Sequence, residues 1–169
     1  MNRAPLPSVE QVRMLPVHHS SVVGDDLIDF NGHMNVLHYL DLAARGADRM
    51  VRDLGIDDAY RDERGLGIFT VEHHLGYHSE LRLGDQLTVH GQVIACSAKV
   101  MHKMCYLLDA GRGRLANTLE IISVHVDLGT RRTAAFPEDV SAALADATNR
   151  TRTLGWAPPV CGAMSVPGQ

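Results

Sequence analysis

The chain is poor in the features that mark several large classes of protein. Among its 169 residues there are three cysteines, Cys96, Cys105 and Cys161, and none of them forms a CxxC pair. An odd, widely spaced set of cysteines argues against a disulfide framework and against a cysteine-based zinc site. Cys96 and Cys105 lie in runs with a strand pattern, so we expect both to be small core residues.

The sequence also lacks an excess of positive charge and a long apolar run. It has 16 Lys and Arg against 20 Asp and Glu, a formal net charge of −4, which argues against nucleic acid as a partner. No apolar run reaches the roughly 18 residues of a membrane helix. The first residues, MNRAPLPSVEQV, lack the apolar segment of a signal peptide. We therefore expect no membrane partner and a cytoplasmic location.

One long helix is predicted over residues 36–54, where apolar residues recur with helical spacing. Asn35 is suited to cap its start and Gly55 to terminate it. Its middle carries the small residues Ala43, Ala44, Gly46 and Ala47. A sheet can therefore pack closely around this helix.

The segment from Gly67 to Leu128 reads as strands. Runs 68–81, 87–95, 100–108 and 115–128 are rich in β-forming residues and are separated by turn signals. Short connections between successive strands predict antiparallel hairpins. A weaker strand is expected within residues 17–28, and Pro137 is expected at the first position of a short helix that ends near residue 150.

We expect a flexible leader over residues 1–16, a single domain over 17–150, and a loosely ordered Pro/Gly-rich tail over 151–169. One long helix cannot cover both faces of the predicted sheet. A second copy of the chain is the simplest cover, so we expect a homodimer or a homotetramer.

A polar motif, Asp29-Phe-Asn-Gly-His-Met-Asn35, directly precedes the long helix. The start of a helix presents unpaired N–H groups and the positive end of its dipole. A carboxylate and an imidazole beside such an end can hold and attack a polarised carbonyl, which indicates hydrolysis of an acyl group. The alternative is structural: Asp29, Asn31 and Gly32 are common turn residues, and Asn35 is suited to be the helix cap.

The motif Asp29-x-x-Gly32-His33-Met34-Asn35 with Tyr39 resembles the signature of 4-hydroxybenzoyl-CoA-type thioesterases. The spacing Tyr77-x-x-Glu80-x-x-x-Gly84-Asp85 is similar to the strand and turn that follow in such enzymes. The resemblance covers roughly residues 17–130. It implies an α+β hotdog fold, in which a curved antiparallel sheet wraps a long central helix and dimers share composite active sites.

The resemblance also implies roles for individual residues. Asp29 matches the position of the family's catalytic carboxylate. Asn31 and His33 match the Asn and His of related plant acyl-carrier-protein thioesterases, which also use a glutamate at the position of Glu80. Residues 67–74 with the motif resemble bacterial betainyl-CoA thioesterases of carnitine breakdown, although the chain departs from them at Asn35 and in its tail.

The predicted function is therefore an acyl-CoA thioesterase that releases CoA and a carboxylate, with a short or polar acyl group such as betainyl. The alternatives are an acyl-thioester hydratase or dehydratase of the same fold and a non-catalytic acyl-CoA-binding module. We predict catalytic roles for Asp29, Asn31, His33 and Glu80. The predicted substrate-binding residues are Gly32, Asn35, Val36, Tyr39, Phe69 and Tyr77.

The sequence also bears on phosphate binding and metal binding. Arg112 and Arg114 are candidates for the CoA phosphates, with solvated turn residues as the alternative. No cofactor is expected beyond the CoA of the substrate. No metal is expected either, because strand alternation puts Glu72 and His74 on one face and His73 on the other, and the sequence shows no third zinc ligand beside Glu72 and His74.

Overall fold

The computed structural model describes residues 5–166 as a helix-and-sheet domain. Its elements are, in order, Val9–Arg13 (α1), Val17–Val22 (β1), the 3-10 helix Asp25–Leu27 (η1), Val36–Asp53 (α2), Asp58–Arg64 (α3), Leu66–Tyr77 (β2), Gln86–Cys96 (β3), Val100–Asp109 (β4), Arg114–Asp127 (β5), Arg132–Thr133 (β6) and Glu138–Arg152 (α4). None of the helices in the described part of the chain combines the length and hydropathy that a membrane span needs.

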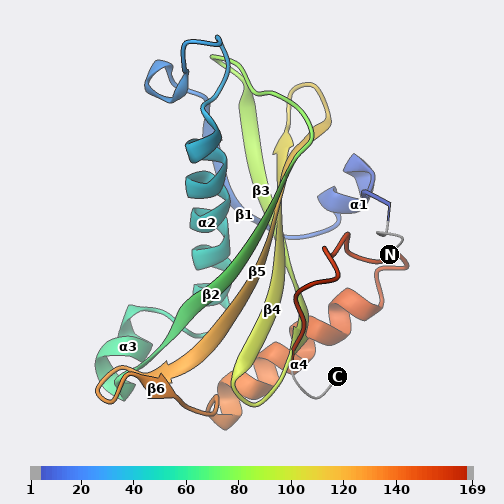
Figure 1. Ribbon diagram of the computed structural model, residues 1–169. Coiled ribbons are helices and arrows are strands. Elements are labelled where there is room, and N and C mark those ends of the chain that lie inside the picture. The colour runs from blue at the N-terminus through green and yellow to red at the C-terminus, as the bar shows by residue number, and fades with distance from the viewer. Residues whose placement is uncertain (1–4, 167–169) are drawn as a thin grey trace.

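The long helix α2 packs against the concave face of a curved sheet (Figure 1). Its start and end agree with the prediction: the Asn35 side chain accepts from the Leu37 N–H over 3.0 Å, and Gly55 has a φ of +92°. Close packing depends on Gly46, because a Cβ there would lie 2.4 Å from Val89 Cγ1 of β3. The small residues of the helix therefore let the sheet approach it, as predicted.

The sheet is antiparallel throughout, with the strand order β1-β3-β4-β5-β2 and with β6 paired to β5. The hairpins β3–β4 and β4–β5 confirm the predicted connections. The expected hairpin between the first two long strands is wrong, because β2 pairs with β5 and lies at the edge of the sheet. Together with α2, this sheet has the predicted α+β architecture of a long helix wrapped by a curved antiparallel sheet.

The connection between β2 and β3 explains this difference. The first long strand was predicted to reach Leu81, but β2 ends at Tyr77. The Met34 N–H donates to the Leu81 carbonyl over 2.7 Å, and the Leu81 N–H donates to Tyr39 Oη over 2.9 Å. These bonds hold residues 78–81 over the start of α2, where they cannot turn directly into β3.

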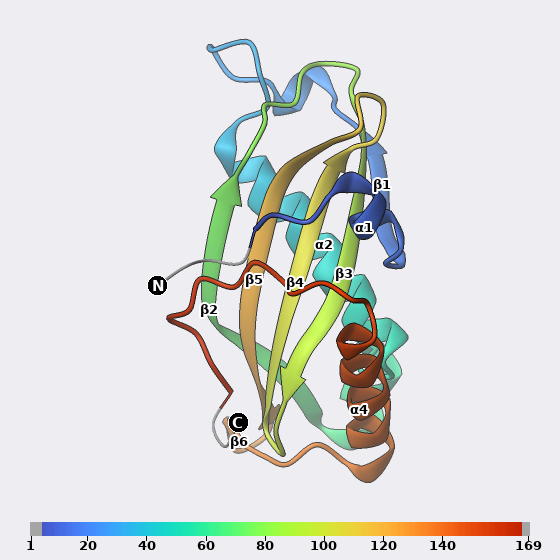
Figure 2. The same ribbon diagram turned by 90° about the vertical axis from the view of Figure 1, so that its right-hand side faces the viewer.

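The outer face of the sheet is covered by the same chain (Figures 1 and 2). Val12 and Leu15, in and just after α1, pack with Tyr106 of β4, and Trp156 and Val160 of the C-terminal segment pack against them. The premise that this face needs a second copy as its cover is therefore wrong. Oligomerisation itself stays a prediction.

The ends of the chain are more ordered than predicted. Residues 9–13 form α1 with a capping box between Ser8 and Gln11, and Val12 is fully buried, which differs from a flexible leader. The segment 153–166 has no regular helix or strand, but Met164 and Val166 are buried. The predicted leader and tail include residues 1–4 and 167–169, which lie outside the described residues.

Smaller differences concern short elements. The strand expected within residues 17–28 ends at Val22 and is followed by η1, while α3 and β6 were not predicted. Pro137 is the cap of α4 rather than its first residue, and α4 continues to Arg152. η1, α3 and β6 have few residues, so their local sequence signals are weak, and the shifts at the ends of α4 are the one or two residues by which helix ends commonly differ.

Candidate active site

The motif before α2 forms a closed turn that begins at Asp29. The Asp29 N–H donates to the His33 carbonyl, and the Gly32 N–H donates to the Asp29 carbonyl, each over 3.0 Å. Gly32 has a φ of +76°, which favours glycine. The Asn31 N–H donates to Asp29 Oδ1 over 2.8 Å in an Asx turn. The turn orients the half-buried Asp29 carboxylate while leaving it lone pairs for a water molecule.

The start of α2 lies directly behind this turn. The His33 ring lies with Nδ1 3.3 Å from the Met34 carbonyl. Asn35 engages two amides of the first turn, the Leu37 N–H through its side chain and the His38 N–H through its carbonyl. Within the described residues, the Val36 N–H is therefore the first-turn amide best placed to donate a hydrogen bond to a ligand.

A cavity of about 280 Å³ opens at this end of the helix. It is lined by His33, Met34, Val36, Tyr39, Tyr77, His78, Ser79 and Glu80. The structure thus brings together His33, Val36, Tyr39, Tyr77 and Glu80 from the predicted set. Met34, His78 and Ser79 also line the cavity and were not predicted; for His78 and Ser79 the reason is that the sequence predicts a strand through residues 78–81.

Tyr39 links the helix to the opposite wall of this cavity. Its hydroxyl accepts from the Leu81 N–H over 2.9 Å and donates to the Ser79 carbonyl over 3.4 Å. Its ring packs edge-on against Tyr77 with 5.4 Å between centroids. Burial raises the pKa of Tyr39, which favours the neutral phenol.

Besides Tyr77, the wall formed by residues 77–80 carries two titratable groups, His78 and Glu80. The exposed Glu80 carboxylate accepts from Arg82 Nε over 2.9 Å. His78 Nε2 lies 3.0 Å from Thr118 Oγ1, and burial lowers the pKa of His78, which favours the neutral imidazole. The cavity is therefore lined by the Glu80 residue on one side and by the start of α2 on the other.

Several predicted residues do not line the cavity. Asp29, Asn31 and Gly32 belong to the adjoining turn, and Asn35 serves as the helix cap. The other predicted residues outside the lining are Phe69, Arg112 and Arg114.

The last three residues lie in other parts of the molecule. Phe69 sits in β2 beneath the guanidinium of Arg131, 4.5 Å from its ring centroid. Arg112 is held in ion pairs with Asp85 and with Asp109, the latter at 3.1 Å. Arg114 is exposed at the start of β5.

A larger cavity, about 480 Å³, lies at the other end of α2. Met50, Gly91, Val93, Ala147 and Leu154 are among its lining residues. Neither the Asp29 turn nor Glu80 contributes to it. We therefore assign the candidate active site to the smaller cavity, where a helix start and several polar side chains converge.

Comparisons with known proteins identify relatives of this chain. The chain is 32% identical over 123 residues to the betainyl-CoA thioesterase of Pseudomonas aeruginosa, a match that covers 71% of this chain and 77% of that protein. It is also 32% identical over 117 residues to the L-carnitine dehydrogenase/betainyl-CoA thioesterase of Rhizobium meliloti. That match covers 69% of this chain but 23% of the relative, so the chain spans about a quarter of that protein.

A solved structure gives the same architecture. The hypothetical protein SAV2348 of Staphylococcus aureus, solved in complex with CoA, is 28% identical with a TM-score of 0.80, over 90% of this chain and 97% of that one. The family model of the Thioesterase-like superfamily matches residues 22–144, which include the Asp29 turn, α2 and the whole candidate site. The chain has the hotdog fold and belongs to the Thioesterase-like superfamily.

Proposed function

We propose that this protein is an acyl-CoA thioesterase that acts at the start of α2. One observation carries the proposal: a cavity bounded by the first turn of α2, His33 and Glu80 adjoins a turn that orients the Asp29 carboxylate. The CoA bound by the S. aureus relative and the names of the curated relatives support an acyl-CoA substrate.

In the proposed reaction, water attacks the thioester carbonyl. Asp29 accepts a proton from the water as a new C–O bond forms, and the Val36 N–H stabilises the negative charge on the carbonyl oxygen. The C–S bond then breaks, and the proton returns to the thiolate. A thiol has a pKa near about 8.5, so its departure needs little help from an acid.

His33, Asn31 and Glu80 have supporting roles in this proposal. The Asn31 N–H holds Asp29 Oδ1 in place, and His33 lines the wall between the Asp29 turn and the helix. Glu80 faces the same cavity and is the second carboxylate able to orient the water. Because Arg82 binds Glu80 in the described chain, a substrate that recruits Glu80 has to compete with this ion pair.

We propose a short or polar acyl group, such as betainyl, as the substrate. The cavity is small and its walls include the edge-on pair Tyr39 and Tyr77 together with the Glu80 carboxylate. Aromatic faces and a carboxylate attract a quaternary ammonium group. We expect Tyr77→Leu to raise the KM for betainyl-CoA more than that for a neutral acyl-CoA of similar size. An equal change for both substrates would contradict this specificity.

We also propose that the site is completed in a homodimer. The edge strand β2 presents unpaired backbone groups and the exposed side chain of Val71. Near the site, Phe30 is 97% exposed and Leu37 is 71% exposed. Sedimentation equilibrium should give a dimer or tetramer for the native chain and a shift to monomer for Val71→Arg. A monomeric native chain would contradict the proposal.

The function is tested by thiol release from a panel of short, aromatic, long-chain and betainyl CoA thioesters. Asp29→Asn should lower kcat at least about 100-fold, because a general base contributes this much or more. The matched control is Asp26→Asn, an exposed carboxylate of η1 outside the cavity lining, which should keep native turnover.

Two other outcomes would contradict the thioesterase assignment and favour an alternative function. Binding of acyl-CoA without thiol release indicates the non-catalytic module. Hydration of an unsaturated acyl-CoA without thiol release indicates the hydratase of the same fold.

A further inference from the structure

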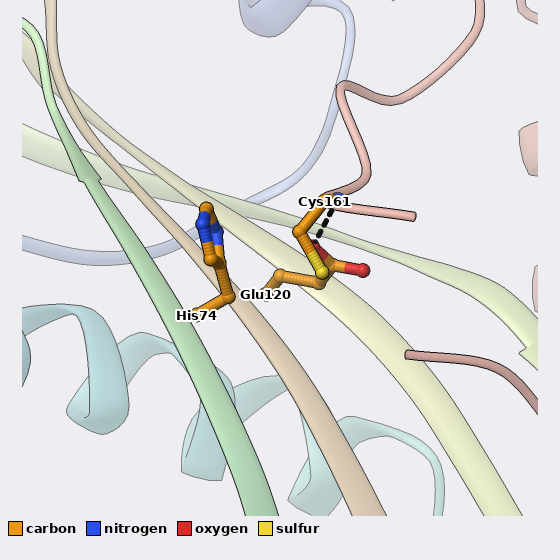
Figure 3. A group of neighbouring side chains, drawn as sticks. All are labelled: His74, Glu120 and Cys161. Carbon is orange, nitrogen blue, oxygen red and sulfur yellow. Dashed lines mark hydrogen bonds between the residues drawn. The ribbon is translucent and has the colours of Figure 1, made fainter. Parts of the chain in front are cut away.

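Three side chains that bind transition metals meet on the outer face of the sheet, away from the candidate active site (Figure 3). They are His74 of β2, Glu120 of β5 and Cys161 of the C-terminal segment. His74 and Glu120 are direct cross-strand partners. One potential ligand atom from each of the three lies within 4.8 Å of the other two.

Glu120 is buried and firmly oriented. Its side chain is 1% exposed; Oε1 lies 2.8 Å from His102 Nε2, and Oε2 accepts from the Cys161 N–H over 2.7 Å. An ionised carboxylate has about four acceptor positions, so both oxygens keep lone pairs. A carboxylate held by a second imidazole is the arrangement that orients a metal ligand from behind.

The three donors are a nitrogen, a sulfur and an oxygen, a combination that suits Zn²⁺ better than Mg²⁺ or Ca²⁺. Zn–ligand bonds of about 2.0–2.3 Å place tetrahedral ligands about 3.5 Å apart. The present spacing needs to close by only about 1 Å. Cys161 lies in a segment without regular helix or strand, and both Cys161 and His74 are half-buried.

We propose that His74, Glu120 and Cys161 bind one Zn²⁺, with His102 as a positioning residue. The Cys161 thiol loses its proton to solvent as the thiolate binds the metal. A fourth position remains for water or for another donor. The site lies on the opposite face of the sheet from α2, and the proposal does not depend on the thioesterase function.

The metal would link the C-terminal segment to the sheet through Cys161, His74 and Glu120. This segment crosses the outer face of the sheet (Figure 2), and Cys161 is 41 residues from Glu120 in the sequence. Zn²⁺ should raise the thermal midpoint of the protein, since it binds the folded state in preference to the unfolded one.

The test uses full-length protein freed of metal with a chelator. Addition of Co²⁺ should produce a thiolate-to-cobalt charge-transfer band that saturates at one metal per chain. Competition with Zn²⁺ should abolish this band. Zn²⁺ should also raise the thermal midpoint of the native chain, measured by circular dichroism.

Four variants separate a metal site from a chance cluster. Cys161→Ser should abolish the band, and His74→Gln should weaken Co²⁺ binding at least tenfold. His102→Gln should keep the band and weaken binding about 10–100-fold, the usual effect of a positioning residue. The matched control is Cys96→Ser, a half-buried thiol outside the cluster, which should leave band and affinity unchanged.

Three results would overturn the proposal. The first is native protein without a charge-transfer band. The second is a band that persists in Cys161→Ser. The third is an equal loss of binding in Cys96→Ser and Cys161→Ser.

Discussion

The two ends of α2 adjoin different cavities. At its start, Asn35 caps the helix and a small cavity of about 280 Å³ is lined by His33, Tyr39 and Glu80 among others. At its far end, a cavity of about 480 Å³ is lined by apolar residues such as Met50 and Leu154 and also by polar ones such as His18 and Arg150. The larger space therefore lies away from the helix start and from the Asp29 carboxylate.

This difference follows from the physics of the helix. Only the start of a helix offers N–H groups to an outside acceptor, and only there does its dipole favour a developing negative charge. Cavity size alone does not supply this chemistry. Changes at the start of α2 should therefore affect turnover, whereas changes at its far end should affect stability.

The largest expected effect on stability is at the far end. Met50 is 4% exposed and lies against Gly91 of β3, so Met50→Ala should lower the free energy of unfolding by about 2–5 kcal/mol. Urea unfolding measures this loss, and Met50→Leu serves as the volume-conserving control. The folded variant should keep its kcat. A large loss of kcat in a stable Met50→Ala protein would contradict the expectation that the far end of α2 affects stability alone.

Tyr39→Phe should affect both properties at the start of the helix. It leaves the buried Leu81 N–H without its acceptor, at a cost of about 1–3 kcal/mol. Because residues 78–80 line the cavity, kcat/KM for acyl-CoA should fall as well. Tyr77→Phe is the control for stability, since the Tyr77 ring is half exposed. Equal stability of the native chain and Tyr39→Phe would show that this bond does not hold the wall.

Asn35→Ala tests the helix cap. The loss of the bond to the Leu37 N–H should reduce stability by about 1 kcal/mol, while Asn35→Ser should retain most of it. Thermal unfolding measures the stability, and thiol release measures turnover. We expect turnover to fall in Asn35→Ala and to recover in Asn35→Ser. Unchanged turnover in Asn35→Ala would separate the cap from the reaction.

The smallest effect is expected when the larger cavity is filled. Ala147→Leu adds volume from α4 at the far end of α2, and kcat/KM for acyl-CoA should stay at the native value. Steady-state thiol release is the measurement, with circular dichroism as the control for folding. A marked rise in KM with native folding would indicate that the acyl group binds in the larger cavity and would contradict its assignment to the smaller one.

The sequence predicted correctly those features that depend on residues close together in the chain. The spacing of apolar residues predicted α2, and Asn35 and Gly55 predicted its ends. Helix periodicity and capping involve residues a few positions apart, so the sequence displays them directly. The turn at Asp29 was also readable, because its hydrogen bonds join residues within the motif.

Signals were weaker where distant segments meet. Leu81 was read as the end of a strand, yet its bonds to Met34 and Tyr39 draw residues 78–81 onto the start of α2. The same strand run concealed His78 and Ser79 as lining residues of the cavity. Strand propensity describes the local chain, whereas the partner of β2 is chosen by packing across the whole sheet.

Neighbouring residues specify the long capped helix, the antiparallel strands and the polar motif that begins at Asp29, because each follows from local periodicity, capping or turn chemistry. Packing between distant segments sets the pairing of β2 with β5, the position of Glu80 beside the start of α2, and the position of Cys161 beside His74 and Glu120. These are contacts between residues far apart in the chain. They form when burial of apolar surface outweighs the entropy of closing long loops, and no local pattern records that balance.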